Sequence, residues 1–140
     1  MADTKQSKIV AFITGAILAD GTYEESEKEA VSMIAETLEI DEKKFLKLVD
    51  SEYQKQDAMS EDDLVDYFNE ISENINEDDA YEIYQFCLQI VFADGFFCKD
   101  EVALMVIFAE ILGIDISEAI IMMISFTSPP IFDNFEEEEE

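Results

Sequence analysis

The chain has 140 residues, a length typical of one compact domain, and carries 35 acidic residues against 8 lysines for a net charge of −27. This charge disfavours nucleic acid and anionic lipid as partners, and it favours cations and basic protein surfaces. Because histidine and arginine are both absent, the chain lacks the commonest general base and the bidentate phosphate clamp, so we expect a protein that is not an enzyme.

The first half reads as three helices. Apolar residues at helical spacing predict a first helix before the stretch ADGTYEESE, residues 19–27, and a second helix after it. These stripes are Ile9, Phe12, Ile13 and Ala16, and then Val31, Ile34, Ala35 and Leu38. Asp41 is a good N-cap and predicts the start of the third helix.

A connecting helix over residues 60–75 follows. Ser60 is its predicted N-cap, and Leu64, Phe68, Ile71 and Ile75 form its apolar stripe. Asn76, followed by three acidic residues, predicts the start of the fifth helix, because negative charge is favourable near the positive end of the helix dipole.

The second half repeats the first without a gap in the alignment. The stretch ADGFFCKDE, residues 93–101, matches residues 19–27, and nine of 23 positions are identical between residues 19–41 and 93–115. We therefore predict an all-α protein of about seven helices, in which two pseudo-symmetric helical halves, residues 7–55 and 81–126, pack into one compact bundle-like domain spanning residues 1–126.

The last predicted helix is apolar on nearly every side. Ile121 and Ile124 replace Lys47 and Asp50 of the first half, so we expect this helix to be central or to lie at an interface, such as that of a homodimer. Beyond it, two prolines stop any helix and five terminal glutamates repel one another, which predicts a mobile acidic tail over residues 127–140.

The sequence indicates a reduced compartment and gives no membrane span. Cys87 and Cys98 form no CxxC motif and have no histidine partner for zinc, as expected of reduced thiols in a cytoplasmic protein. The most apolar stretch, residues 102–126, is interrupted by acidic residues, and the N-terminus has no signal-peptide core. We expect no direct membrane insertion.

The repeated acidic stretch resembles half of a calcium-binding loop. With Gly21 at position 6 of such a loop, Asp20 falls at position 5 and Glu27 at position 12, and Asp94 and Glu101 repeat the pattern. Positions 1 and 3 are apolar in both copies, which argues against high-affinity calcium binding within one loop. Two interpretations stay open: a structural turn that joins two helices, or a weak divalent-cation site in which the two loops pool their carboxylates.

Two copies of A-D-G-x-aromatic-x-x-x-E, each followed by a helix ending in L-x-I-D, resemble the TerB-like (tellurite-resistance protein B) family over about residues 7–126. The resemblance implies two interlocked helical halves, in bacterial proteins linked to tellurite resistance and to stress or phage defence. It also implies a cytoplasmic metal-sensing or adaptor module near membrane partners, without enzymatic activity. The family's acidic loop residues fall on Asp20, Glu27, Asp94 and Glu101.

Two functional hypotheses follow. The first is a module that binds a divalent cation through the paired acidic loops. The alternative is a protein-interaction adaptor, whose apolar last helix and acidic surface bind a basic protein or a membrane protein at its cytoplasmic face.

Overall fold

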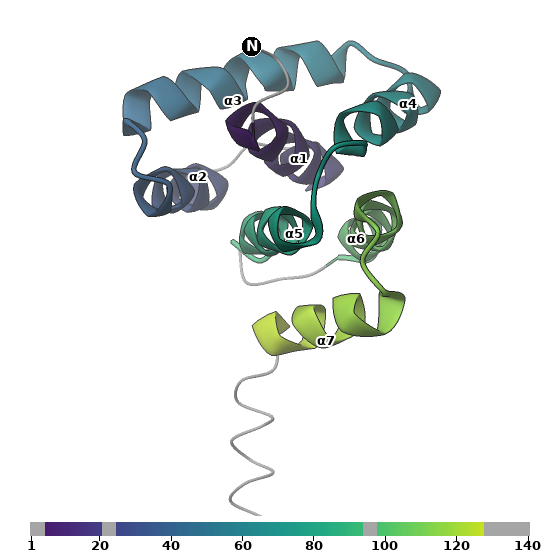
Figure 1. Ribbon diagram of the computed structural model, residues 1–140. Helices are drawn as coiled ribbons and strands as arrows, with labels where there is room; N and C mark the ends of the chain where they lie inside the picture. Colours follow the sequence, from purple (N-terminus) through teal and green to yellow (C-terminus); the bar gives the residue numbers. More distant parts are fainter. Residues whose placement is uncertain (1–4, 21–24, 94–97, 128–140) are drawn as a thin grey trace, which may run out of the picture.

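The computed structural model describes residues 5–20, 25–93 and 98–127, and these ranges form seven α-helices without a β-strand (Figure 1). The all-α class predicted from the sequence is therefore confirmed. In chain order the helices are α1 (Lys5–Asp20), α2 (Glu25–Thr37), α3 (Glu42–Asp57), α4 (Glu61–Ser72), α5 (Glu77–Val91), α6 (Lys99–Leu112) and α7 (Ile116–Thr127). Apart from its first residue, the predicted acidic tail lies outside the described residues.

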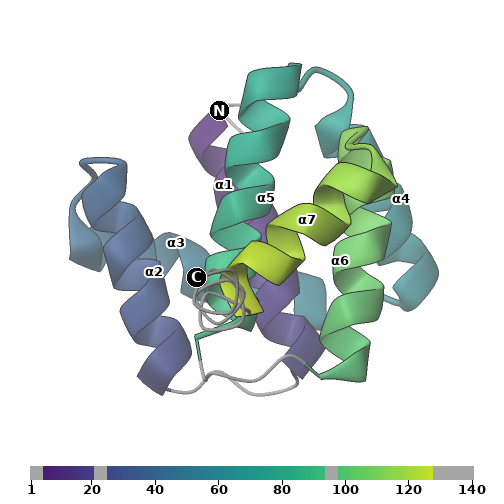
Figure 2. The same ribbon diagram turned by 90° about the horizontal axis from the view of Figure 1, so that it is seen from below.

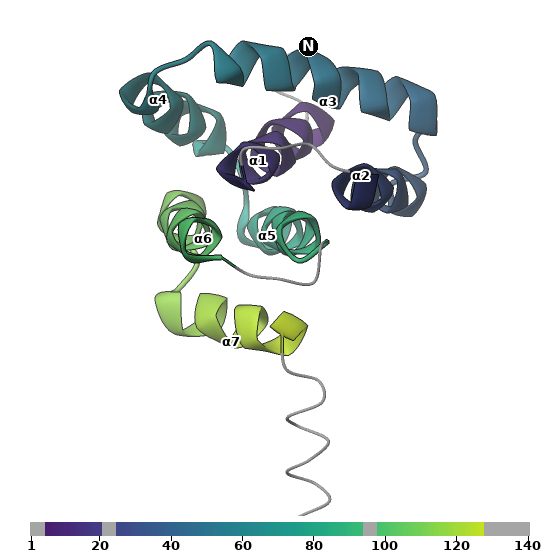
Figure 3. The same ribbon diagram turned by 180° about the vertical axis from the view of Figure 1, so that it is seen from behind.

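The helices form three layers. In Figure 1 and Figure 3, α1, α2, α5 and α6 are seen nearly end-on in the middle of the molecule. Helices α3 and α4 cover one side of this middle layer, and α7 crosses the opposite side. The buried residues follow this arrangement. Their longest runs lie in α1 and α5, two helices of the middle layer.

The predicted N-caps of α3, α4 and α5 are confirmed. The side chains of Asp41, Ser60 and Asn76 each accept a hydrogen bond from the backbone N–H three residues later, at 3.0, 3.2 and 2.8 Å. Each bond satisfies a donor that the helix itself leaves unpaired. Three acidic residues in the first turn of both α4 and α5 add a favourable interaction with the helix dipole.

The two halves interlock. Helices α1 and α5 pack against each other, α2 packs on α5, and α6 packs on α1, so each half places its second helix on the first helix of the other half. Helix α3 contacts both α1 and α2, and α7 likewise contacts both α5 and α6. Helix α4 has no counterpart in the second half and packs on α1 and α6.

Positions that the repeat aligns are buried alike. Ile34 and its counterpart Phe108 both have zero exposure, and the same holds for Val31 and its counterpart Met105. The core centres on three rings, Phe12, Phe68 and Phe108, whose centroids lie 5.0 Å apart in every pair. Edge-to-face and tilted contacts of this kind are favourable beyond the apolar area that they bury.

The structure places α7 on the surface, so the expectation that it could be central is wrong. Ala119 and Met123 are buried, whereas four isoleucines, Ile116, Ile120, Ile121 and Ile124, are 41–62% exposed. Helix α7 forms an outer layer that no other described helix covers (Figure 1). The hydroxyl of Tyr81 on α5 is hydrogen-bonded to Glu118 on α7, which raises the pKa of Tyr81 to about 12.

Glu39 occupies a backbone conformation that suits glycine. Its φ is +59°, and its counterpart after α6 is Gly113, with a φ of +76°. A left-handed conformation costs a residue with a Cβ about 1–2 kcal/mol, whereas glycine adopts it freely. We therefore expect Glu39→Gly to raise the free energy of unfolding by about 1 kcal/mol in urea denaturation. The matched change Gly113→Ala should lower it by a similar amount, and a destabilised Glu39→Gly protein would contradict this reasoning.

No described helix is both long enough and apolar enough to cross a membrane.

Candidate functional site

The two predicted glutamates lie at equivalent positions and are both buried. Glu27 is in the first turn of α2 and Glu101 in the first turn of α6, and their exposed fractions are 4% and 3%. The backbone of Asp20 ends α1, but its side chain and the whole of Asp94 lie outside the described residues. A buried carboxylate requires hydrogen bonds or a cation, because leaving it unpaired away from water is costly.

Glu101 has a structural partner. Its Oε1 atom accepts the backbone N–H of Cys98, the N-cap of α6, at 3.0 Å. Both Glu101 and Glu27 have further interactions with neighbouring groups. A carboxylate has about four lone-pair positions, so one capping hydrogen bond uses only part of its capacity as an acceptor. The capping role of Glu101 supports the structural interpretation of the motif.

Interlocking brings the helix of each glutamate beside the helix that precedes the other half's acidic turn. Because α6 packs on α1, the helix that carries Glu101 lies beside the helix that ends at Asp20. Ala93, which directly precedes Asp94, lines the same hollow as Ser26 and Ala30 in the first turns of α2. Figure 2 shows the flanking ends of α1, α2, α5 and α6 along one edge of the molecule.

The donor types fit a hard divalent cation, although the described residues alone do not complete a site. Calcium and magnesium prefer carboxylate and carbonyl oxygens, which is the donor set that the two acidic turns supply. Among the described residues, no group of three or more histidine, cysteine, aspartate and glutamate side chains could hold a metal ion. A complete ligand set would therefore need the aspartates of the two turns.

A buried polar network that the sequence analysis missed joins α1, α3 and α4. The Nε2 atom of Gln56, which has zero exposure, donates to Ala11 O at 2.8 Å and to Glu52 Oε2 at 2.7 Å. The hydroxyl of Tyr67 donates to the same Glu52 oxygen at 2.6 Å. Burial and this hydrogen bond raise the pKa of Tyr67 well above its usual value. Gln56 continues the stripe of Phe45 and Val49 at helical spacing, so its burial could have been predicted.

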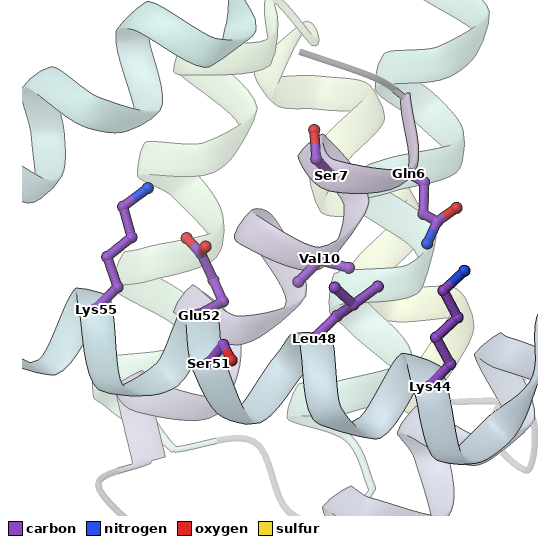
Figure 4. A pocket seen from close by; sticks show the side chains of 8 residues that line it. All are labelled: Gln6, Ser7, Val10, Lys44, Leu48, Ser51, Glu52 and Lys55. Atoms are coloured by element: carbon purple, nitrogen blue, oxygen red, sulfur yellow. The ribbon is translucent and has the colours of Figure 1, made fainter. Parts of the chain in front are cut away.

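The hollow between α1 and α3 has mixed charge and is a poor anion site. It has a volume of about 460 Å³, with Lys44 near one end, Lys55 and Glu52 near the other, and Val10 and Leu48 between them (Figure 4). The two lysines lie three helical turns apart on one helix, or roughly 16 Å along its axis. They are therefore too far apart to hold one small anion together.

The two cysteines should differ sharply in reactivity. Cys87 is fully buried, and burial raises the pKa of its thiol far above the usual range, whereas Cys98 is exposed at the start of α6. Because the thiolate is the reactive form, we expect iodoacetamide to modify Cys98 alone in the folded protein, and both thiols after unfolding. Mass spectrometry of the labelled protein checks this, and rapid labelling of Cys87 in the folded chain would contradict the core packing.

Comparison with known families identifies one family that matches most of the chain. The family described as tellurite resistance protein TerB matches residues 6–123. The chain belongs to the TerB family. Comparison with curated proteins gave no match, and comparison with solved structures gave none either. Within the TerB family, the match includes all four predicted acidic residues, Asp20, Glu27, Asp94 and Glu101.

Proposed function

We propose that this TerB-family protein is a non-enzymatic stress-response module that binds a divalent cation weakly through its two acidic turns, Asp20, Glu27, Asp94 and Glu101. The observation that supports the proposal is the interlocked packing, in which the helix ending at Asp20 lies beside the helix that carries Glu101. Carboxylates from both halves would then act on one ion. A bound cation would offset the repulsion among these carboxylates and the desolvation of the two buried glutamates.

In this proposal the protein works in the bacterial cytoplasm, as the resemblance to the family implies. The net charge of −27 raises the local concentration of cations, and a weak site would respond to a change in their concentration. The chain's own residues would bind and position the ion, and no covalent bond would be made or broken.

Calorimetric titration of the full chain with calcium, magnesium, manganese and zinc tests the proposal. We expect saturable binding heat for at least one ion, and loss of that heat in the double variant Asp20→Ala, Asp94→Ala. The matched control Asp62→Ala, Asp66→Ala removes the same charge from exposed positions of α4 and should keep the heat. Equal heats in all three proteins would show diffuse counterion binding and would refute the proposal.

The exposed face of α7 supports a second candidate function, an adaptor for a protein partner. Four exposed isoleucines on one short helix form an apolar surface of the kind that marks protein interfaces. The partner would be a second copy of this chain or a membrane protein at its cytoplasmic face. Sedimentation of the wild type and of Ile121→Gln tests the homodimer, because a dimer through α7 should dissociate in the variant. A wild-type chain that stays monomeric at high concentration would exclude the homodimer.

A further inference from the structure

A second surface of the molecule forms an apolar groove between α1, α4 and α6. We call it the α4–α6 groove; its volume is about 380 Å³. At its base lies Gly15, where an added Cβ would be 2.8 Å from a ring carbon of Phe68 and 2.9 Å from one of Phe108. Val65 on α4 and Ile107 on α6 also line the groove, and each is 44% exposed. The groove therefore exposes aliphatic side chains above a base of buried rings.

The internal repeat gives this groove a counterpart in the other half. A hollow of about 350 Å³ lies between α2, α5 and α7. In the alignment of the two halves, its residues Phe92, Ala93 and Met33 are the counterparts of Leu18, Ala19 and Ile107 in the α4–α6 groove. The two hollows are thus equivalent places on the two halves of the protein.

In the second hollow, the chain itself supplies an aromatic side chain. Phe126, near the end of α7, stacks on Phe92 with a centroid distance of 5.8 Å and an angle of 9° between the rings. The counterpart of Phe126 in the first half is Glu52, whose carboxylate is bound by Tyr67 and Gln56. No equivalent aromatic side chain of the described chain therefore lies over Leu18 in the α4–α6 groove.

The charge around the α4–α6 groove indicates the chemistry of an occupant. Helix α4 carries five carboxylates and no lysine, and α6 carries three carboxylates and one lysine. The acidic residues of α4 are Glu61, Asp62, Asp63, Asp66 and Glu70. Of these carboxylates Glu61 lines the groove itself, and the net charge of −27 attracts basic segments to the protein, so the apolar groove is complementary to an amphipathic helix that is basic on its flanks.

We propose that the α4–α6 groove binds a basic helical segment of a partner protein, which places one aromatic side chain over Leu18, beside Val65 and Ile107, as Phe126 lies on Phe92. One of the segment's lysines or arginines faces Glu61, the carboxylate that lines the groove. Glu27 and Glu101, the two cation-site residues whose side chains the structure describes, do not line this groove, so the docking site and the cation site are tested separately.

A synthetic peptide tests the proposal with the full chain. The probe is a helical peptide of about 15 residues, built from alanine and lysine with one central phenylalanine. The reference peptide has alanine in place of the phenylalanine. We expect calorimetry to show at least about tenfold weaker binding of the reference peptide, and amide NMR shifts to map the phenylalanine peptide to α4 and α6.

Matched variants locate the binding site. Val65→Gln and Ile107→Gln, alone and combined, change exposed positions and should leave the fold intact. The combined variant should bind the phenylalanine peptide at least about tenfold more weakly than the wild type does. Met33→Gln, the repeat-related counterpart of Ile107→Gln, and Ile121→Gln on α7 should change the affinity less than about twofold.

Three results would overturn the proposal. Equal binding of the two peptides would show attraction by charge alone. A loss of affinity in Ile121→Gln equal to that in the groove variants would place the docking face on α7. Self-association of the chain that the groove variants abolish would show that a second copy occupies the groove. Thermal melting of each variant, followed by circular dichroism, separates loss of binding from loss of fold.

Discussion

Replacing Phe108 by alanine is expected to lower the free energy of unfolding by about 3–5 kcal/mol, the largest effect that we predict for a single substitution. Phe108 has zero exposure, and its ring contacts those of Phe12 and Phe68 across three helices. Removing the ring loses its transfer free energy, and it also leaves a cavity that α1, α4 and α6 cannot close without moving. Urea denaturation measures the effect.

Two further variants make this prediction specific. Ile107→Ala changes the neighbouring residue, which is 44% exposed, and should cost about 1 kcal/mol or less. Gly15→Ala should destabilise the wild type by about 1–3 kcal/mol, because its Cβ would crowd Phe68 and Phe108. In the Phe108→Ala background the same methyl group enters the new cavity, so its cost should fall or reverse. A cost that is the same in both backgrounds would contradict the packing around Gly15.

Gln56→Ala is expected to lower the free energy of unfolding by about 2–4 kcal/mol. The change removes two hydrogen bonds, one to Ala11 O on α1 and one to the carboxylate of Glu52, and leaves a cavity in the wall between α3 and α1. Since both partners of Nε2 are acceptors, the orientation of the amide is fixed, and Oε1 has no hydrogen-bond partner among the described residues.

The unpaired oxygen provides a second comparison at the same position. Gln56→Leu removes the two hydrogen bonds but also the unsatisfied acceptor, and it fills most of the space. It should therefore cost less than Gln56→Ala, by about 1–2 kcal/mol. Gln54→Ala, at an exposed position on the same helix, should change stability by less than about 0.5 kcal/mol. A cost at Gln56 as small as that at Gln54 would contradict the buried network.

The helices could be predicted from the sequence because local signals fix them. Asp41, Ser60 and Asn76 act as caps in the structure because a side-chain oxygen at a helix start pairs with a backbone N–H nearby in sequence. The spacing of apolar residues likewise predicted the buried faces of α1 and α2, because a helix that packs on one side repeats about every 3.6 residues.

The packing of the helices against one another could not be predicted from such local signals. The packing of α2 on α5 and of α6 on α1 joins segments far apart in the chain, which no local spacing encodes. For α7 the sequence left two positions open, central or at an interface, since composition shows that a helix is apolar but not whether another helix covers it. The stripe of Phe45 and Val49 extends to Gln56, yet only the structure shows that its partners are Ala11 O and Glu52.

The candidate site could likewise be predicted only in part from the sequence. The sequence singled out four carboxylates as a candidate site, and the structure shows that two of them, Glu27 and Glu101, are buried in the first turns of their helices. The sequence left open whether the two loops lie close enough to pool their carboxylates. The interlocked packing puts the helix that ends at Asp20 beside the helix that carries Glu101.

Amide NMR of the full chain during a calcium titration tests directly whether the two acidic turns act as one cation site. The account predicts that the backbone signals of Glu27 and Glu101 shift together, follow a single dissociation constant, and stop responding in both turns when Asp20 alone is replaced by alanine. Signals that titrate independently in the two turns, or that drift without saturation, would contradict it.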